Sequence, residues 1–169
     1  MNAECVIQDH LPPLGLTWGV KRSFISYLTR LPDGAVSAAD GANVVASSLF
    51  NFAPDSSDYG PSSSTGTLRF SGDVRMAGHQ GMMFVRLLDP WIEFRVDEAE
   101  LSVSTTNDDG SGLQRIVLGT MRPIAPQSAP GALVWQGVDV ALTEAGSEVF
   151  NQQYPAGQEL DPLFIRIVA

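Results

Sequence analysis

Hydrophobic and polar side chains alternate along much of the chain, and this alternation is the first guide to its structure. In the segment 67–76, the apolar residues Leu68, Phe70 and Val74 alternate with polar residues that include Asp73. Successive side chains of a β-strand point to opposite faces of a sheet, so a period of two residues predicts a strand. The segment therefore predicts β structure, and similar short runs follow it to the end of the chain.

Turn residues separate these apolar runs and predict antiparallel pairing between them. Residues 35–53 predict a hairpin around Asp40-Gly41, and the Ser- and Pro-rich residues 54–65 predict a surface loop. Gly78-His79-Gln80-Gly81 predicts a turn, and Asp89-Pro90 is expected to separate two strands. Further strands are predicted over 82–88, 91–96, 100–104, 113–121, 132–140 and 163–168. Many short strands with few helices predict a mainly β fold, either an antiparallel β-sandwich or a partly closed barrel.

One stretch has the spacing of an α-helix instead. Between Gly19 and Leu28, apolar side chains recur three or four residues apart, and this face includes Val20, Phe24 and Tyr27. Ser23 precedes Tyr27 by one helical turn, so both hydroxyl groups can reach one object packed against the helix. The first helix therefore carries a candidate binding pair.

Length and composition favour a single domain. The chain has 169 residues, which suffice for one hydrophobic core, and no change in composition divides it. We expect an irregular lead-in over residues 1–15 and one domain over 16–169. A second short helix is predicted over 142–150, capped by Thr143. Cys5 is the single cysteine, so a disulfide within the chain is excluded.

The charge disfavours nucleic acid as a partner. The chain carries 19 acidic and 10 basic residues, with a formal net charge of −9, whereas phosphate binding needs clustered Lys and Arg. No apolar run is long enough to span a bilayer, and the first residues lack the basic and apolar regions of a signal peptide. The sequence as given therefore predicts neither a membrane anchor nor an export signal.

Local motifs of enzymes are missing from the sequence. It contains no Gly-rich phosphate loop, no His-rich metal motif and no Gly-x-Ser-x-Gly nucleophile turn. His10 lies near the terminus, and residues 107–109 form an oxygen-rich turn without the spaced acids of a calcium loop. Tyr27 and His79 remain as candidates, although a helical Tyr or a His in a turn is more often structural.

Four ordered motifs resemble those of HtaA domains, the haem-binding modules of haem-uptake systems in Gram-positive bacteria. The first is Leu16-Thr17-Trp18-Gly19-Val20-Lys21-Arg22-Ser23-Phe24-Ile25-Ser26-Tyr27. The second spans Gly66 to Gly81 and includes Gly72 and the Gly-His-x-Gly turn, and the third is Leu88-Asp89-Pro90-Trp91-Ile92. The last comprises Leu142-Thr143, Gly146, Phe150, Tyr154, Gly157, Leu160-Asp161-Pro162 and Phe164. The resemblance covers the chain from about Leu16 to its end.

This resemblance implies a cofactor and a role for each candidate residue. Tyr27 would be the axial ligand of the iron in ferric haem b, His79 would hydrogen-bond that tyrosine, and Ser23 would contact a haem propionate. Ferric iron favours an anionic oxygen, whereas a free phenol stays protonated near neutral pH. The phenol therefore needs both the metal and a neighbouring base to lose its proton. A neutral imidazole beside the phenol assists its deprotonation.

The leading interpretation is a non-enzymatic domain that binds haem for its capture, relay or transport. The resemblance further implies a location at the cell surface or outside the cell, with other haem-carrier proteins as partners. Two alternatives stay open. One is a haem-dependent, peroxidase-like enzyme, and the other is a structural or adhesive β-sandwich without a cofactor, in which Tyr27 and His79 both pack in the core.

Overall fold

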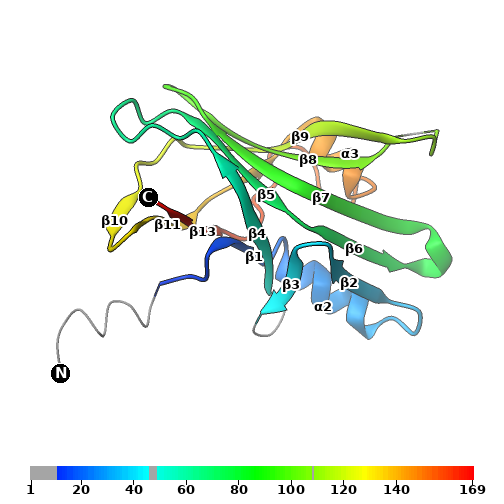
Figure 1. The fold of residues 1–169 in the computed structure, drawn as a ribbon. Coiled ribbons are helices and arrows are strands. Elements are labelled where there is room, and N and C mark those ends of the chain that lie inside the picture. The colour runs from blue at the N-terminus through cyan, green and yellow to red at the C-terminus, as the bar shows by residue number, and fades with distance from the viewer. Residues whose placement is uncertain (1–10, 46–48, 108) are drawn as a thin grey trace.

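The polypeptide forms an antiparallel sheet that curls into a partly closed barrel, with two short helices beside it (Figure 1). This computed structural model describes residues 11–45, 49–107 and 109–169. Within those residues, thirteen strands belong to one sheet. The predicted mainly β fold is confirmed, and of the two predicted forms the partly closed barrel is the one observed. Cys5, His10 and most of the predicted lead-in lie outside the described residues.

One α-helix follows the first strand and the other precedes the last strand, with successive strands between them. The first eight elements are β1 (Gly15–Trp18), α2 (Arg22–Arg30), β2 (Ala35–Ala39), β3 (Ala42–Val45), β4 (Leu49–Ser57), β5 (Gly66–Ser71), β6 (Asp73–Gly78) and the 3₁₀ turn η1 (His79–Gly81). The others are β7 (Met83–Phe94), β8 (Ala99–Thr106), β9 (Leu113–Met121), β10 (Gln127–Ala129), β11 (Ala132–Val138), β12 (Ala141–Leu142), α3 (Glu144–Val149) and β13 (Leu163–Val168).

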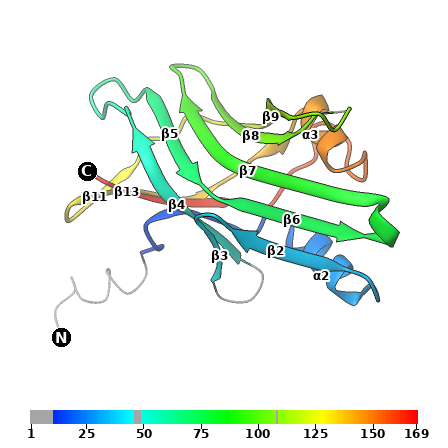
Figure 2. The same ribbon diagram turned by 45° about the vertical axis from the view of Figure 1, so that its right-hand side comes forward.

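The sheet does not close on itself. Its main path runs β10-β11-β13-β1-β4-β5-β7-β8-β9-β12, while β2 pairs with β6 and β3 with β4. Strands β7, β8 and β9 form the predicted antiparallel meander, and the last predicted strand is observed over Leu163–Val168. The hairpin of β6 and β7 projects from the sheet, and α2 lies beneath it in both views (Figures 1 and 2).

Three predictions about the strands and the segments between them were wrong. Residues 35–53 do not form a hairpin, because the turn at Asp40-Gly41 sends β2 to pair with β6 and β3 to pair with β4. Residues 54–65 are not all loop, since β4 continues to Ser57. Asp89-Pro90 does not end a strand: the register of β7 shifts there and Asp89 takes a φ of 48°, so a bulge accommodates the proline inside one long strand.

The first predicted helix is observed as α2, but its buried side differs from the prediction. Phe24, Ile25 and Leu28 are buried, whereas Tyr27 is 45% exposed. Each residue turns an α-helix by about 100°, which places Tyr27 at the margin of the sector centred on Phe24 and Leu28. Burying side chains such as these contributes roughly 1.5–3 kcal/mol each. The helix is therefore anchored by its apolar side and presents Tyr27 outward.

The second predicted helix is confirmed as α3. The Thr143 hydroxyl accepts a hydrogen bond from the Gly146 amide at 2.9 Å and thereby caps the first turn. Phe150, directly after the helix, is fully buried in the core. In the part of the chain that the structure describes, neither helix has the length and apolar character needed to cross a membrane.

One charged side chain lies inside the domain. Asp73 falls on the polar side of the sequence alternation, yet only 3% of its surface is exposed. Arg86 donates to its carboxylate at 2.9 and 3.1 Å, and Arg75 donates at 2.9 Å. Burial raises the pKa of Asp73, but the hydrogen bonds and charges of Arg86 and Arg75 outweigh that effect and hold the pKa below its usual value. The carboxylate therefore stays ionised and links β6 to β7.

We expect Asp73→Asn to lower the free energy of unfolding at pH 7 by about 2 kcal/mol, less than for a fully buried pair because Arg75 is half-exposed. Below about pH 4 the Asp73 carboxylate takes up a proton more readily in the unfolded chain than in the folded chain. The free energy of unfolding of the wild type therefore decreases as the pH is lowered. Urea unfolding at pH 7 and from pH 4 downward checks both effects. A stability difference that is the same at every pH would contradict the assignment.

Candidate functional site

Tyr27 and His79 meet at the outer end of the β6–β7 hairpin. The Tyr27 hydroxyl lies 2.7 Å from Nε2 of His79, and the two ring centroids are 5.8 Å apart. Both side chains are exposed, so they form a polar pair on the surface of the domain. When the proton of the imidazole is on Nδ1, Nε2 accepts the hydrogen bond from the phenol.

Packing between the hairpin and α2 brings this pair together. Gly78 ends β6 against the helix, and a Cβ atom at this position would come within 2.8 Å of Leu31 and 3.1 Å of Leu28. A side chain here would have to displace the ends of Leu31 and Leu28, so the glycine permits a close approach that brings His79 to Tyr27. His79 itself adopts a φ of 51° at the start of the turn. The predicted Gly-His-x-Gly turn therefore serves as a close contact with the tyrosine helix.

A distant residue holds the other end of α2. The Asp161 carboxylate accepts a hydrogen bond from the Arg22 amide at 3.0 Å, so it acts as the helix cap that Lys21 does not provide. The Asp161 amide donates to the Val20 carbonyl at 2.9 Å, and the Trp18 indole donates to the Asp161 carbonyl at 2.7 Å. These contacts hold Val20 at a φ of 61°, which a β-branched residue rarely adopts.

Ser23 lies beside a second tyrosine rather than beside His79. Its hydroxyl is hydrogen-bonded to Tyr154, whose ring contacts Phe24 edge to face at 5.9 Å. Burial raises the pKa of the Tyr154 phenol, the bond from Ser23 opposes this, and the charge of Asp161 adds to it. Tyr154 therefore stays protonated near neutral pH. The Lys21 ammonium lies 5.9 Å from the centre of the same ring.

Apolar side chains are exposed along the strand that follows the His79 turn. Met82 is 86% exposed and Phe84 is 44% exposed. Asn151, just after α3, lies close to the same strand, with its amide 3.4 Å from the Met83 sulfur. Met82 lies three residues after His79, whereas Phe84 lies on the face of β7 opposite that of Met83, beside Arg86 and Val149.

The geometry gives the two phenols different chemistry. Tyr27 is exposed and faces an imidazole that can accept its proton, whereas Tyr154 is half-buried and burial raises the pKa of its phenol. A metal ion that prefers anionic oxygen would bind at Tyr27, with His79 as the neighbouring base. The structure thus brings Tyr27 and His79 together and places Ser23 one helical turn away, on the same outward side of α2.

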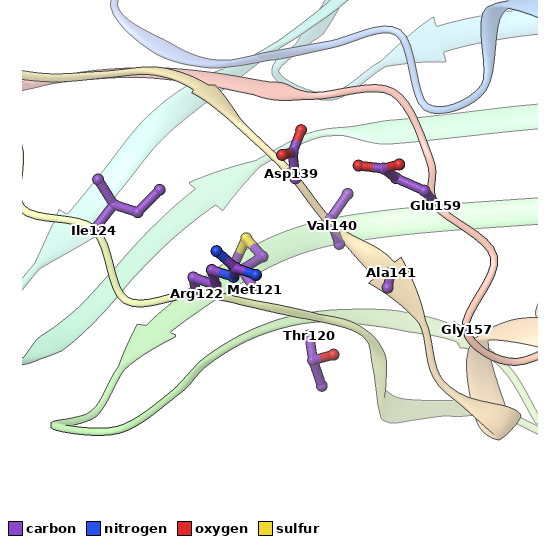
Figure 3. Close-up of a pocket in the computed structure, with 9 residues that line it drawn as sticks. All are labelled: Thr120, Met121, Arg122, Ile124, Asp139, Val140, Ala141, Gly157 and Glu159. Atoms are coloured by element: carbon purple, nitrogen blue, oxygen red, sulfur yellow. The ribbon is translucent and has the colours of Figure 1, made fainter.

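Hollows elsewhere on the described surface are lined by other residues. A cavity of about 590 Å³ lies beside β12 and the end of β9, at the open edge of the barrel (Figure 3). Arg122, Asp139 and Glu159 reach it from three separate segments. The turn considered for calcium is closed by its own contacts, since Asp109 accepts from the Ser111 amide and hydroxyl. Among the described residues, no three acidic, His or Cys side chains gather as a metal site.

Sequence reasoning assigned no role to several residues around the pair. Tyr154 and Asp161 belong to the last of the four motifs, so their spacing was visible although their contacts were not. No pattern in the sequence singles out Asp33, yet its carboxylate accepts a hydrogen bond from the Gln80 amide. Met82 and Phe84 were interpreted as ordinary strand residues.

Fold and site together define a class: a partly closed antiparallel barrel that presents a tyrosine–histidine pair from a short helix and a β-turn. The HtaA family model (described as "Htaa") matches residues 14–166. The chain therefore belongs to the HtaA family. No curated protein matches the sequence.

Solved structures with the same fold come from Corynebacterium glutamicum. The C-terminal domain of HtaA is 24% identical, with 92% of this chain and 97% of that chain covered at a TM-score of 0.75. The N-terminal domain of HtaA is 25% identical, covers 91% and 96%, and has a TM-score of 0.71. The haem-binding protein HtaB is 19% identical, covers 90% and 91%, and has a TM-score of 0.67.

We expect Asp161→Ala to lower the free energy of unfolding by about 1 kcal/mol, because the first turn of α2 loses its cap. Asp161→Asn keeps an oxygen that accepts from the Arg22 amide and should cost less. Glu159→Ala removes a nearby exposed carboxylate and is the control. Chemical denaturation of the three variants measures the effect. Equal losses in Asp161→Ala and Glu159→Ala would refute the cap.

Proposed function

We propose that this domain binds ferric haem b through the Tyr27 oxygen, with His79 as the base that supports it, and that it captures or relays haem without acting as an enzyme. The observation that carries the proposal is the 2.7 Å contact between an exposed phenol and an imidazole nitrogen. Haem supplies the ferric ion, and the chain supplies an oxygen ligand whose proton can be taken up beside it.

The surroundings of the pair fit the rest of a haem molecule. Met82, three residues after His79, offers exposed apolar surface for the macrocycle. The Ser23 hydroxyl and the Lys21 ammonium lie on the same helix, one and two turns before Tyr27, and would accept the negative propionates. Although the chain is acidic overall, Lys21 provides a positive charge where the haem propionates would bind. The family membership and the haem-binding description of HtaB support this assignment.

The exposure of the pair favours transfer over permanent storage. Tyr27 is 45% exposed, so a haem on its oxygen would keep one side open to solvent or to a partner. Loading and release by another haem carrier then require no opening of the core. His79 is engaged with the oxygen of the expected ligand, a role that supports binding of iron rather than turnover of peroxide.

The exposure also argues against a purely structural role. In that alternative both Tyr27 and His79 would pack in the core, whereas both are exposed and neither contributes to the buried cluster. Packing in the core therefore does not explain why these two side chains lie together.

Tyr27→Phe should weaken ferric haem binding by more than about 100-fold, beyond the usual loss for a residue that merely supports a metal ligand. The substitution keeps the ring and removes only the oxygen. Hemin titration followed at the Soret band gives the affinity, and the tyrosinate charge-transfer bands report the ligand.

The matched control is Tyr154→Phe, which removes the other phenol of the site. It should keep the tyrosinate bands, because burial keeps the Tyr154 phenol protonated and the proposed iron ligand is Tyr27. A Tyr27→Phe protein with the spectrum and affinity of the wild type would show that another residue binds the iron.

Reduction of the haem iron should speed its release. A phenolate stabilises Fe(III) over the softer Fe(II), so the bond to Tyr27 weakens when the iron is reduced. Transfer of haem to apomyoglobin, measured with and without dithionite, tests this. Equal transfer rates together with tyrosinate bands in the ferrous complex would contradict the proposed ligand.

A further inference from the structure

We propose that Asp33 is a positioning residue for His79, and this inference rests on the proposed function of the Tyr27–His79 pair. Asp33 follows α2, and its Oδ2 accepts a hydrogen bond from the Gln80 backbone amide at 2.5 Å. Gln80 is the residue after His79. The loop that ends the tyrosine helix thereby holds the turn that carries the histidine.

The turn needs such a contact because its backbone is strained. His79, Gln80 and Gly81 have φ values of 51°, 58° and 83°, so three successive residues lie in the left-handed region. Glycine adopts this conformation freely, whereas His and Gln adopt it at a cost of about 1–2 kcal/mol each. Within the turn, the Met82 amide donates to the His79 carbonyl at 3.1 Å. The Asp33 carboxylate provides a second restraint, from outside the hairpin.

Asp33 can act as a fixed point because its loop is packed tightly on α2. The Leu31 amide donates to the Leu28 carbonyl, and the Gly34 amide donates to the Leu31 carbonyl, each at 3.1 Å. A Cβ atom on Gly34 would lie 1.7 Å from the Leu28 carbonyl oxygen, so only glycine fits there. Asp33 lies between these contacts and therefore keeps a constant place relative to Tyr27.

Two links consequently join α2 to the His79 turn. One is the hydrogen bond between Tyr27 and His79, and the other is the hydrogen bond between Asp33 and Gln80. The second link fixes the backbone, and the backbone sets the direction of the imidazole. Without Asp33, residues 79 and 80 can relax to ordinary φ values, which turns Nε2 away from the phenol. The Tyr27 oxygen then loses its neighbouring base.

Asp33→Ala tests this role in the haem-bound protein. Hemin release to apomyoglobin should become about tenfold faster, at the lower end of the effect of losing a residue that orients a metal ligand. Asp33→Asn keeps an acceptor oxygen and should restore a rate close to that of the wild type. In a His79→Ala background, Asp33→Ala should add nothing, because the two residues act through one another. Each variant is first compared with the wild type by size-exclusion chromatography.

A matched control distinguishes positioning from general loop stability. Asp58 accepts a hydrogen bond from the Thr67 amide at 2.6 Å, the same kind of contact in a different loop. Asp58→Ala should leave the rate of hemin release unchanged. Equal acceleration in Asp33→Ala and Asp58→Ala, no acceleration in Asp33→Ala, or an undiminished effect of Asp33→Ala without His79 would each overturn the proposal.

A measurement on the haem-free protein separates this inference from the proposed function. NMR should show faster exchange of the Gln80 amide and loss of the Tyr27–His79 ring contacts in Asp33→Ala, with both features retained in Asp58→Ala. If wild-type protein fails to bind hemin, the proposed function fails, and the haem-free result still decides the role of Asp33. Unchanged ring contacts in Asp33→Ala would refute it while leaving haem binding intact.

Discussion

The hydrogen bond between the Tyr27 phenol and the His79 imidazole is the contact on which the functional surface depends. It joins two segments that are 52 residues apart in the sequence and belong to different kinds of structure, a helix and a β-turn. Neither side chain is buried, so packing of its own does not hold either one. Their distance is set by the elements beneath them, namely α2 packed through Phe24, Ile25 and Leu28, and a hairpin whose Gly78 touches that helix.

Carboxylates reinforce these elements at three places, and each does so for a different physical reason. Asp73 is an ionised group inside the domain: Arg75 and Arg86 keep it charged, and its contact with Arg86 joins β6 to β7. Asp161 accepts a hydrogen bond from the Arg22 amide and so caps the start of α2. Asp33 restrains a turn of unfavourable backbone geometry. Some of the acidic side chains of this chain thus serve as hydrogen-bond acceptors for backbone amides and arginines.

Local patterns were enough to predict much of this architecture. The helical spacing around Phe24, the Gly-His-x-Gly turn, the Thr143 cap and the strand at Leu163–Val168 all follow from neighbouring residues, and all are observed. Partner choice between strands was not predictable in this way. The turn at Asp40-Gly41 looks like a hairpin turn, yet β2 pairs with β6 because pairing is decided by the shape of the whole sheet.

The candidate site shows the same division between local and distant information. Ser23, Tyr27 and His79 were candidates from the residues themselves, and the family resemblance supplied their expected roles. The contact between Tyr27 and His79 is observed. The burial of Asp73 and the roles of Asp33 and Asp161 depend on distant partners, and a single sequence does not contain those distances. Tyr27 was predicted on the apolar side of its helix because it shares the three-residue spacing, although it lies at the margin where solvent begins.

The cap of α2 has a consequence for how the domain matures. The helix that presents Tyr27 begins at Arg22, but the carboxylate that completes its first turn lies 139 residues later, just before the final strand. Contacts between such distant segments form late, since the intervening chain must first be ordered. During synthesis, the N-terminal half emerges with the ligand helix incomplete. The first turn of α2 is therefore completed only when the segment just before the last strand has joined the domain.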